Sequence, residues 1–302
     1  MNPFRCSAAS LSRDETIVGT ASTVRAFLLV ENPGPWGVDA LRDARLEPVE
    51  VRDALRERAA LAGVRVLLIR RPGRAAAAED RRVFAAYADP EQPWLETTTV
   101  SGPRALLDLD LESLARGRSP GLTHTDEPVF CVCTHGRHDA CCAELGRPTA
   151  AALSLSHPEQ TWEVSHVGGD RFAANLLVLP DGLYYGRLDP VGAPGLAARH
   201  LEGHLDLTRL RGRSGYSFAV QVAEVGLRRE LGETRRDAVR LLWVRTEGDL
   251  TRVSFQVLGA GASATYAVQV RRGTQPAQQL TCRALRANPV PAYDVVDVTR
   301  AE

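Results

Sequence analysis

The chain has 302 residues, of which 44% are hydrophobic and 25% are charged, an ordinary balance for a folded protein with more than one core. Its 37 basic residues balance 37 acidic ones, so neither nucleic acid nor an anionic membrane surface is expected as a main partner. All the basic residues are arginine, and the absence of lysine excludes lysine Schiff-base catalysis, a Walker A phosphate loop and a protein-kinase site.

The first residues contain no apolar run long enough for a signal peptide, and no stretch approaches roughly eighteen uninterrupted apolar residues. Six cysteines spread over the chain without a secretion signal argue against a disulfide framework. We therefore expect a cytoplasmic protein whose thiols serve a metal or redox role.

The first hundred residues predict alternating strands and helices. Residues 24–30 and 64–69 are apolar runs typical of buried strands, and residues 49–61 between them have helical periodicity. The turn Asn32-Pro33-Gly34-Pro35-Trp36-Gly37 and a short helix at 38–43 fill the connection, with Trp36 expected as a packing anchor. Strand, helix and strand with short links indicate a βαβ unit in a mainly parallel sheet.

A loop, a helix and a strand are predicted next. The loop Arg70-Arg71-Pro72-Gly73-Arg74 follows a strand, where α/β proteins bind ligands, so an anion site competes with a solvated loop there. Residues 75–87 are rich in alanine and arginine and predict a surface helix, and residues 100–111 predict a strand with its connection. Residues 117–125 are expected to form a linker.

The central segment predicts a strand at 128–133 that ends at a Thr-His-Gly loop. Asp139 is expected as the N-cap of a short helix that carries Cys141 and Cys142, and Pro148 should end that helix or begin a second one running to about 155. A strand at 162–165 then opens at His166 into a glycine loop. The turn Pro180-Asp181-Gly182 between two apolar runs predicts a hairpin.

The last third predicts helices at 195–202 and 214–231, followed by antiparallel strands at 239–244, 251–258 and 264–270. Gly259-Ala260-Gly261 is expected as a hairpin turn, and residues 293–298 as an edge strand. His200 and His204 have a spacing that places two imidazoles on one helix face, as a metal site requires, although solvent-facing histidines are the competing interpretation. For Cys282 we expect a packed strand residue.

Soft metal ligands concentrate in the central segment, where four of the six cysteines and four of the seven histidines lie between Cys131 and His166. Cys133 and Cys142 flank a loop and a helix start, and a thiolate near a helix N-terminus is stabilised by the helix dipole. His166 adds a nitrogen donor, and mixed cysteine and histidine sets bind zinc or iron–sulfur clusters. Gly168 and Gly169 would let backbone N–H groups approach a cluster sulfide. Asp170 is expected as a fourth, oxygen ligand or as a partner for an imidazole.

Each of these groups also has a structural interpretation. Cys131 is expected as a small buried hydrophobe, and Cys141 and Cys142 as one ligand and one packing residue. His135 and His138 lie in a polar loop and are equally consistent with solvated side chains. Asp170 could pair with Arg171 or cap a turn.

The motifs Cys-Thr-His-Gly-Arg-His-Asp-Ala-Cys-Cys-Ala from Cys133 and Ser-His-Val-Gly-Gly-Asp-Arg-Phe-Ala-Ala-Asn from Ser165 resemble those of the sucrase/ferredoxin-like family. The resemblance runs from about residue 24 to 231. It implies a thioredoxin-like [2Fe–2S] ferredoxin whose cluster ligands follow a Cys-x8-Cys and a His-x3-His pattern. Cys133, Cys142 and His166 match these positions, whereas Asp170 stands in place of the second histidine.

Together these features predict an α/β protein in which a thioredoxin-like ferredoxin module (119–195) follows an N-terminal α/β module (1–118) and precedes a smaller α+β region (196–302). The favoured function is electron transfer through a [2Fe–2S] cluster to an unidentified redox protein. The alternative is a cluster-free thiol-redox or zinc-binding protein, and a homologue that has lost its redox site is a third possibility. Sugar hydrolysis is not expected, because no credible pair of opposed carboxylates is present.

Overall fold

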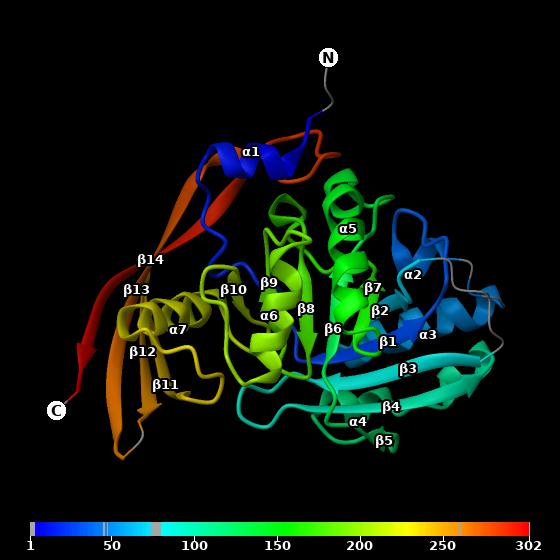
Figure 1. Cartoon of the computed structure of the whole chain (residues 1–302), viewed down its shortest axis with the longest axis horizontal. Coiled ribbons are helices and arrows are strands. Elements are labelled where there is room, and N and C mark those ends of the chain that lie inside the picture. Colours follow the sequence, from blue (N-terminus) through cyan, green and yellow to red (C-terminus); the bar gives the residue numbers. More distant parts are fainter. Residues whose placement is uncertain (1–3, 45, 47, 74–79, 260, 302) are drawn as a thin grey trace.

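The computed structural model describes residues 4–44, 46, 48–73, 80–259 and 261–301. Within these ranges the strands form one curled ten-stranded sheet, in the order β10-β9-β8-β6-β7-β2-β1-β3-β4-β5, and a separate four-stranded sheet, in the order β11-β12-β13-β14 (Figure 1). No helix of the described residues is long and apolar enough to span a membrane.

The first half of the large sheet begins with the predicted βαβ unit. Strands β1 (Ala26–Glu31) and β2 (Arg65–Arg70) pair in parallel, and helix α3 (Val49–Ala62) connects them after the short helix α2 (Ala40–Asp43). Helix α3 ends at Gly63, whose φ of 77° is a left-handed conformation that favours glycine. Trp36 is buried, as expected of a packing anchor.

The helix expected at 75–87 is wrong for its described part, because residues 80–87 form strand β3 (Asp80–Tyr87). This strand lies between β1 and β4 (Trp94–Ser101) and pairs with both in antiparallel fashion. Val83 to Ala86 are all buried, so tertiary packing on both faces overrides the helix propensity of the alanines. Residues 75–79 of this prediction, and Arg74 of the predicted loop, lie outside the described residues.

The strand expected within residues 100–111 is wrong beyond Ser101, where β4 ends, because a 3-10 helix (Pro103–Asp108) and α4 (Leu111–Ala115) follow. The next strand, β5 (Thr123–His124), pairs with β4 inside the segment expected as a linker. Among the described strands of the large sheet, only β1–β2 and β6–β7 are parallel pairs. The prediction of a mainly parallel sheet is therefore wrong. It rested on the strand–helix–strand units, whereas most neighbouring strands of the sheet pair in antiparallel fashion.

The second half of the sheet repeats the arrangement of the first. Strands β6 (Val129–Cys133) and β7 (Thr161–Val164) pair in parallel across helix α5 (Ala140–Ser156), and β8 (Leu176–Leu179) and β9 (Leu183–Tyr185) form the predicted hairpin. The order β9-β8-β6-β7 thus matches β4-β3-β1-β2, and antiparallel pairing of β2 with β7 joins the two halves.

Helix α5 begins at the predicted N-cap, since the Asp139 carboxylate accepts from the backbone N–H of Cys141. The helix then runs without interruption past Pro148, so the expected break is wrong. Its buried face, formed by Cys142, Gly146, Thr149, Ala150 and Leu153, packs on the sheet and holds the helix despite the backbone hydrogen bond that the proline lacks.

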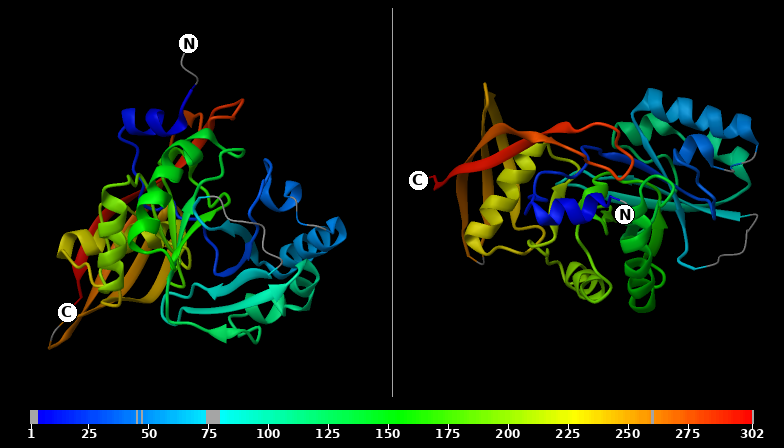
Figure 2. Two further views of the ribbon diagram at one scale, coloured as in Figure 1. Left: turned by 45° about the vertical axis from the view of Figure 1, so that its right-hand side comes forward. Right: turned by 90° about the horizontal axis from the view of Figure 1, so that it is seen from above.

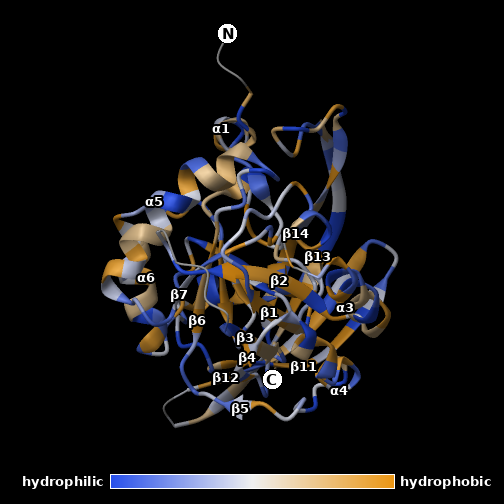
Figure 3. Ribbon diagram, turned by 90° about the vertical axis from the view of Figure 1, so that its right-hand side faces the viewer, coloured by the Kyte–Doolittle hydropathy of each residue, from blue (hydrophilic) through white to orange (hydrophobic). Residues whose placement is uncertain are grey.

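Three apolar clusters place the sheet at the centre of the molecule. Helices α3 and α4 cover the β1–β3 region, and α5 with α6 (Gly192–Leu201) cover β6, β8 and β9. On the inner face of the curl, side chains from both halves meet, as in the edge-to-face contact of Phe84 with Trp162. Figure 3 shows the hydrophobic central strands β1 and β2, with helices of mixed hydrophilic and hydrophobic residues around them.

Beyond β10 (Leu210–Arg213), helix α7 (Phe218–Leu231) packs on the four-stranded sheet (Figure 2). This sheet consists of β11 (Val239–Glu247), β12 (Leu250–Leu258), β13 (Ser263–Gln278) and the edge strand β14 (Asn288–Arg300), all antiparallel as predicted. The N-terminal helix α1 (Cys6–Ser12) lies beside the connection between β13 and β14 and against the 3-10 helix Asp170–Phe172 (Figure 1).

Candidate metal centres

Two loops at one edge of the large sheet carry the predicted ligands. Cys133 ends β6, and Cys142 lies in the first turn of α5. His166 lies two residues beyond the end of β7, and Asp170 begins the 3-10 helix after the glycine loop. Because β6 and β7 are parallel neighbours, with Cys133 opposite Val164, both loops leave the sheet at the same edge.

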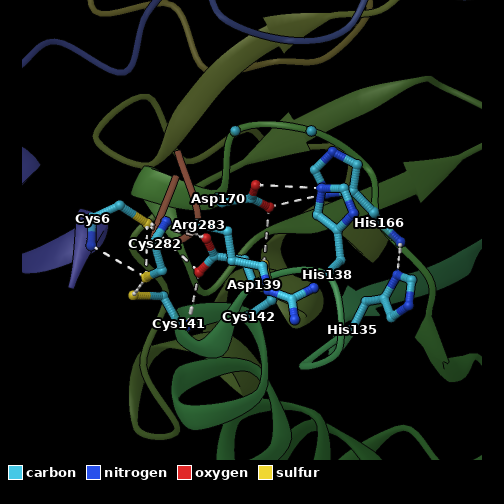
Figure 4. Close-up of polar contacts among 12 residues, drawn as sticks. Cys6, His135, His138, Asp139, Cys141, Cys142, His166, Asp170, Cys282 and Arg283 are labelled. Carbon is cyan, nitrogen blue, oxygen red and sulfur yellow. Dashed lines mark hydrogen bonds and ion pairs between the residues drawn. The ribbon is translucent and has the colours of Figure 1, made fainter. Parts of the chain in front are cut away.

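The four predicted ligands converge there. The Cys142 thiol donates to Asp170 Oδ1 at 3.2 Å, and His166 Nδ1 lies 2.9 Å from the same oxygen (Figure 4). Asp170 therefore contacts His166 and Cys142, whereas Arg171 pairs with Glu15 instead. The thiol of Cys133 adjoins both Cys142 and His166.

These contacts set the ionisation of the group. The bonds to Cys142 and His166 hold the pKa of Cys133 well below that of an ordinary thiol despite burial, and the bond to Cys133 together with burial raises the pKa of Cys142. Burial would lower the pKa of His166, but Asp170 and Cys133 raise it to about 9. Burial would raise the pKa of Asp170, yet His166 holds it below its usual range. These shifts favour negative charge on Cys133 and Asp170 and positive charge on His166, which lies between them.

The sequence profile of the sucrase/ferredoxin-like family matches residues 17–212. The chain belongs to this family. Comparison of the chain with curated proteins and with solved structures found no match. The matched region contains both loops and all ten strands of the large sheet except the end of β10.

A buried arginine within the family region supports the glycine loop. Arg211 Nη1 donates to Gly168 O at 2.9 Å and to Asn175 Oδ1 at 2.8 Å, and Nε donates to Thr20 Oγ1 at 3.0 Å. Gly169 has φ of 79°, and a Cβ at this residue would lie 2.3 Å from Arg211 Nη2. The close approach explains why glycine occupies this position. The sequence alone does not reveal this contact between Arg211 and the loop, because Gly168 and Arg211 are 43 residues apart.

The interpretation of the first loop's histidines as solvated is wrong for His135, which is buried, whereas the side chain of His138 is 32% exposed. His135 is buried, and its Nε2 lies 2.9 Å from Gly37 O while its Nδ1 accepts from the backbone N–H of His166 at 3.2 Å. His138 stacks on His166 with ring centroids 3.7 Å apart, and its Nε2 is 3.7 Å from Asp170 Oδ2. His138, His166 and Asp170 can each offer an atom within 4.8 Å of the others.

A cavity of about 410 Å³ opens beside these rings. Its walls include His135, His138, His166, Arg65 and residues of α2. The imidazole edges therefore face a recess that a partner or a small molecule can reach, whereas the thiols of Cys133 and Cys142 lie buried behind them.

A second group of potential ligands was not predicted. Cys6 in α1, Asp139 and Cys141 at the start of α5, and Cys282 between β13 and β14 have donor atoms within 4.8 Å of one another. Cys282 lies in a turn between β13 and β14, so the expectation of a packed strand residue is wrong. Cys141 belongs to this group and Cys142 to the first, while Cys131 is a buried core residue, as expected. Cys6 and Cys282 both lie outside the region that matches the family.

His200 and His204 do not form the alternative metal site. His200 is buried in α6, where its Nε2 lies 3.3 Å from Asp181, and the helix ends at Leu201 before His204 is reached. His204 Nδ1 contacts Thr234 instead. The solvent-facing interpretation is wrong for His200, since its ring is buried and its Nε2 contacts Asp181 and Arg236.

Proposed function

We propose that this protein transfers electrons through a [2Fe–2S] cluster held by Cys133, Cys142, His166 and Asp170. The observation that carries the proposal is the convergence of two thiols, an imidazole and a carboxylate from two adjacent loops. His166 Nδ1 lies 2.9 Å from Asp170 Oδ1 and the Cys142 thiol 3.2 Å from the same oxygen, so the nitrogen, oxygen and sulfur donors already face one another.

The chemistry of these donors fits such a cluster. Two thiolates select iron–sulfur or zinc chemistry, and a nitrogen and an oxygen donor can complete the set on the second metal. The N-terminus of α5 favours negative charge at Cys142. Family membership and the strand order of the β6–α6 half support a thioredoxin-like module around the site.

The cluster would supply one-electron transfer, and the chain's residues control access to it. Cys133 and Cys142 are fully buried, whereas the side chains of His166 and His138 are 28% and 32% exposed. The imidazole face at the 410 Å³ cavity is thus the side from which a redox partner would approach. Gly168 and Gly169, with φ of 95° and 79°, are proposed to let the loop backbone approach the bound group.

Purification of the full chain without oxygen, with an absorption spectrum and iron and sulfide analysis, tests the proposal. Iron and acid-labile sulfide in equal amounts are expected, and serine at either Cys133 or Cys142 should abolish both. The matched control is Cys131→Ser, because Cys131 is a buried thiol that belongs to neither group. Protein without iron and sulfide, or equal loss in the control, would contradict the assignment.

The triad of His138, His166 and Asp170 favours a second candidate, a single divalent metal ion. This candidate needs His138 and no sulfide, whereas the cluster needs Cys133 and Cys142. His138→Ala should therefore remove zinc or iron only if the single-ion arrangement is correct. Retained iron and sulfide in His138→Ala would leave the cluster as the better account.

A further inference from the structure

We propose that Cys6, Cys141, Cys282 and Asp139 form a second metal site that binds one zinc ion. The four residues come from helix α1, the first turn of α5 and the connection between β13 and β14. Cys6 and Cys282 are 276 residues apart in sequence, yet their sulfurs are 3.6 Å apart. The site is distinct from the proposed cluster site and does not depend on it (Figure 4).

The distances fit the edges of a tetrahedron around one ion. Zinc–sulfur bonds of about 2.3 Å and zinc–oxygen bonds of about 2.0 Å imply sulfur–sulfur edges near 3.8 Å and sulfur–oxygen edges near 3.5 Å. Here Cys141 Sγ is 3.4 Å from Cys282 Sγ, and Cys282 Sγ is 3.6 Å from Cys6 Sγ. Cys6 Sγ is 3.6 Å and 3.7 Å from the two oxygens of Asp139.

The same distances argue against other uses of three cysteines. A disulfide needs sulfur atoms about 2.05 Å apart, and one bridge among three thiols would leave the third alone. Because every pair of donor atoms lies within 4.8 Å, the space suits a single ion and not the separated ligands of a multi-iron cluster. Three thiolates with one carboxylate at a tetrahedral centre select zinc over magnesium or calcium, which take oxygen ligands.

Hydrogen bonds from neighbouring backbone N–H groups and one hydroxyl orient the donor atoms of Asp139, Cys282 and Cys141. Asp139 accepts from the N–H of Cys141 at 2.9 Å and from the N–H of Cys282 at 2.7 Å, which fixes its carboxylate between the two segments. The N–H of Cys6 donates to Cys282 Sγ at 3.4 Å, and the Ser7 hydroxyl donates to Cys141 Sγ at 3.1 Å. Such hydrogen bonds orient metal ligands and stabilise thiolate charge, as does the N-terminus of α5.

The ion would act as a structural tie. Cys6, Cys141 and Asp139 are buried, so the ion would be closed off from solvent except near the half-buried Cys282. Four protein ligands leave no open position, which is typical of structural and not catalytic zinc. Zinc would fasten α1 and the β13–β14 connection to the helix that carries Cys142.

The test is metal analysis of the full chain purified with reductant. About one zinc per chain is expected, and replacement of zinc by cobalt should give thiolate-to-cobalt charge-transfer bands and tetrahedral ligand-field bands. Cys6→Ala and Cys282→Ala should each lower zinc content at least tenfold. The control Cys131→Ala removes a buried thiol outside both groups and should retain zinc.

Two readouts separate this site from the cluster site. Iron and sulfide should be unchanged in Cys6→Ala and Cys282→Ala, whereas Cys133→Ser should lose iron and keep zinc. Alkylation of the wild-type chain gives a test that does not depend on the folding of any variant. Cys6, Cys141 and Cys282 should be protected from the alkylating reagent while zinc is bound and should react after zinc is removed by a chelator. Zinc-free protein, unchanged alkylation after chelation, or a disulfide among these three cysteines in the reduced preparation would each overturn the proposal.

Discussion

Gly146 sets the distance between helix α5 and strand β6, so its replacement by alanine tests how the first site is built. A Cβ at residue 146 would lie 2.0 Å from the backbone oxygen of Cys133. Ordinary contact begins at 3.4 Å, so the helix would have to retreat by about 1.4 Å, because a strand backbone cannot rotate away as a side chain can. That retreat would carry Cys142 away from Cys133.

Two opposing energies decide the outcome of Gly146→Ala. Alanine improves helix propensity by up to about 1 kcal/mol, whereas overpacking of this kind costs about 1–3 kcal/mol or more. We expect net destabilisation of about 1–2 kcal/mol, together with reduced iron incorporation. The measurements are the denaturant midpoint followed by circular dichroism and the iron content of the purified variant.

The matched control is Gly195→Ala in helix α6. A Cβ there meets its nearest neighbour, Arg199 Nη1, at 3.6 Å, so alanine fits without movement. This variant should gain up to about 1 kcal/mol from helix propensity and retain its iron. If Gly146→Ala were as stable as Gly195→Ala and kept its iron, the inferred contact between α5 and β6 would be refuted.

Substitutions at three further residues probe the glycine loop, the arginine that supports it and a buried carboxylate. Asp170→Ala should lower iron content and alter the spectrum if Asp170 is a ligand, whereas Asp170→His should raise the reduction potential by removing an anionic ligand; an unaltered cluster in Asp170→Ala would refute ligation. Arg211→Met leaves the carbonyl of Gly168 and the amide of Asn175 without their donor and should cost about 2–4 kcal/mol in denaturant unfolding, against about 0.5 kcal/mol for the surface control Arg199→Met. Glu224→Gln leaves Arg213 and Arg228 buried without their carboxylate and should cost about 3–5 kcal/mol at pH 7, while Glu230→Gln on the exposed face of the same helix should cost little. Burial opposes ionisation of Glu224, but the two arginines hold its pKa below the usual value. The stabilisation from this carboxylate is therefore present above the unfolded-state pKa of about 4.3 and is lost as pH falls. The difference in unfolding free energy between wild type and Glu224→Gln, measured in urea, should shrink in acid, and a constant difference would contradict the pairing.

Local sequence patterns predicted most of the elements around the site. The apolar runs at 24–30, 64–69 and 128–133, the N-cap at Asp139 and the Pro180-Asp181-Gly182 turn act over a few residues, and each appears in the structure where the sequence places it. The same local rules failed where tertiary packing determines the secondary structure. Residues 80–87 have alanine-rich helix propensity but lie between two strands, and Pro148 stays within a helix whose other face is buried.

The predicted ligands of the first site lie within 38 residues of one another, in two motifs that follow adjacent strands. Their convergence could therefore be predicted from strand pairing alone. The second group could not, because Cys6 and Cys282 lie near opposite ends of the chain, and isolated cysteines have no periodicity that reveals a partner. The stacking of His138 on His166 was also hidden, since a loop's conformation decides which way its rings point.

The first turn of α5 makes the two groups neighbours. Consecutive residues on a helix point about 100° apart, so Cys141 faces α1 and the β13–β14 connection while Cys142 faces Asp170. Asp139 caps this turn and also holds Cys282, and Gly146 fixes the helix against Cys133 one turn later. Adjacent cysteines therefore need not be one ligand and one packing residue, as the sequence suggested. Each can serve a different site, and the position of one helix end determines the geometry of both.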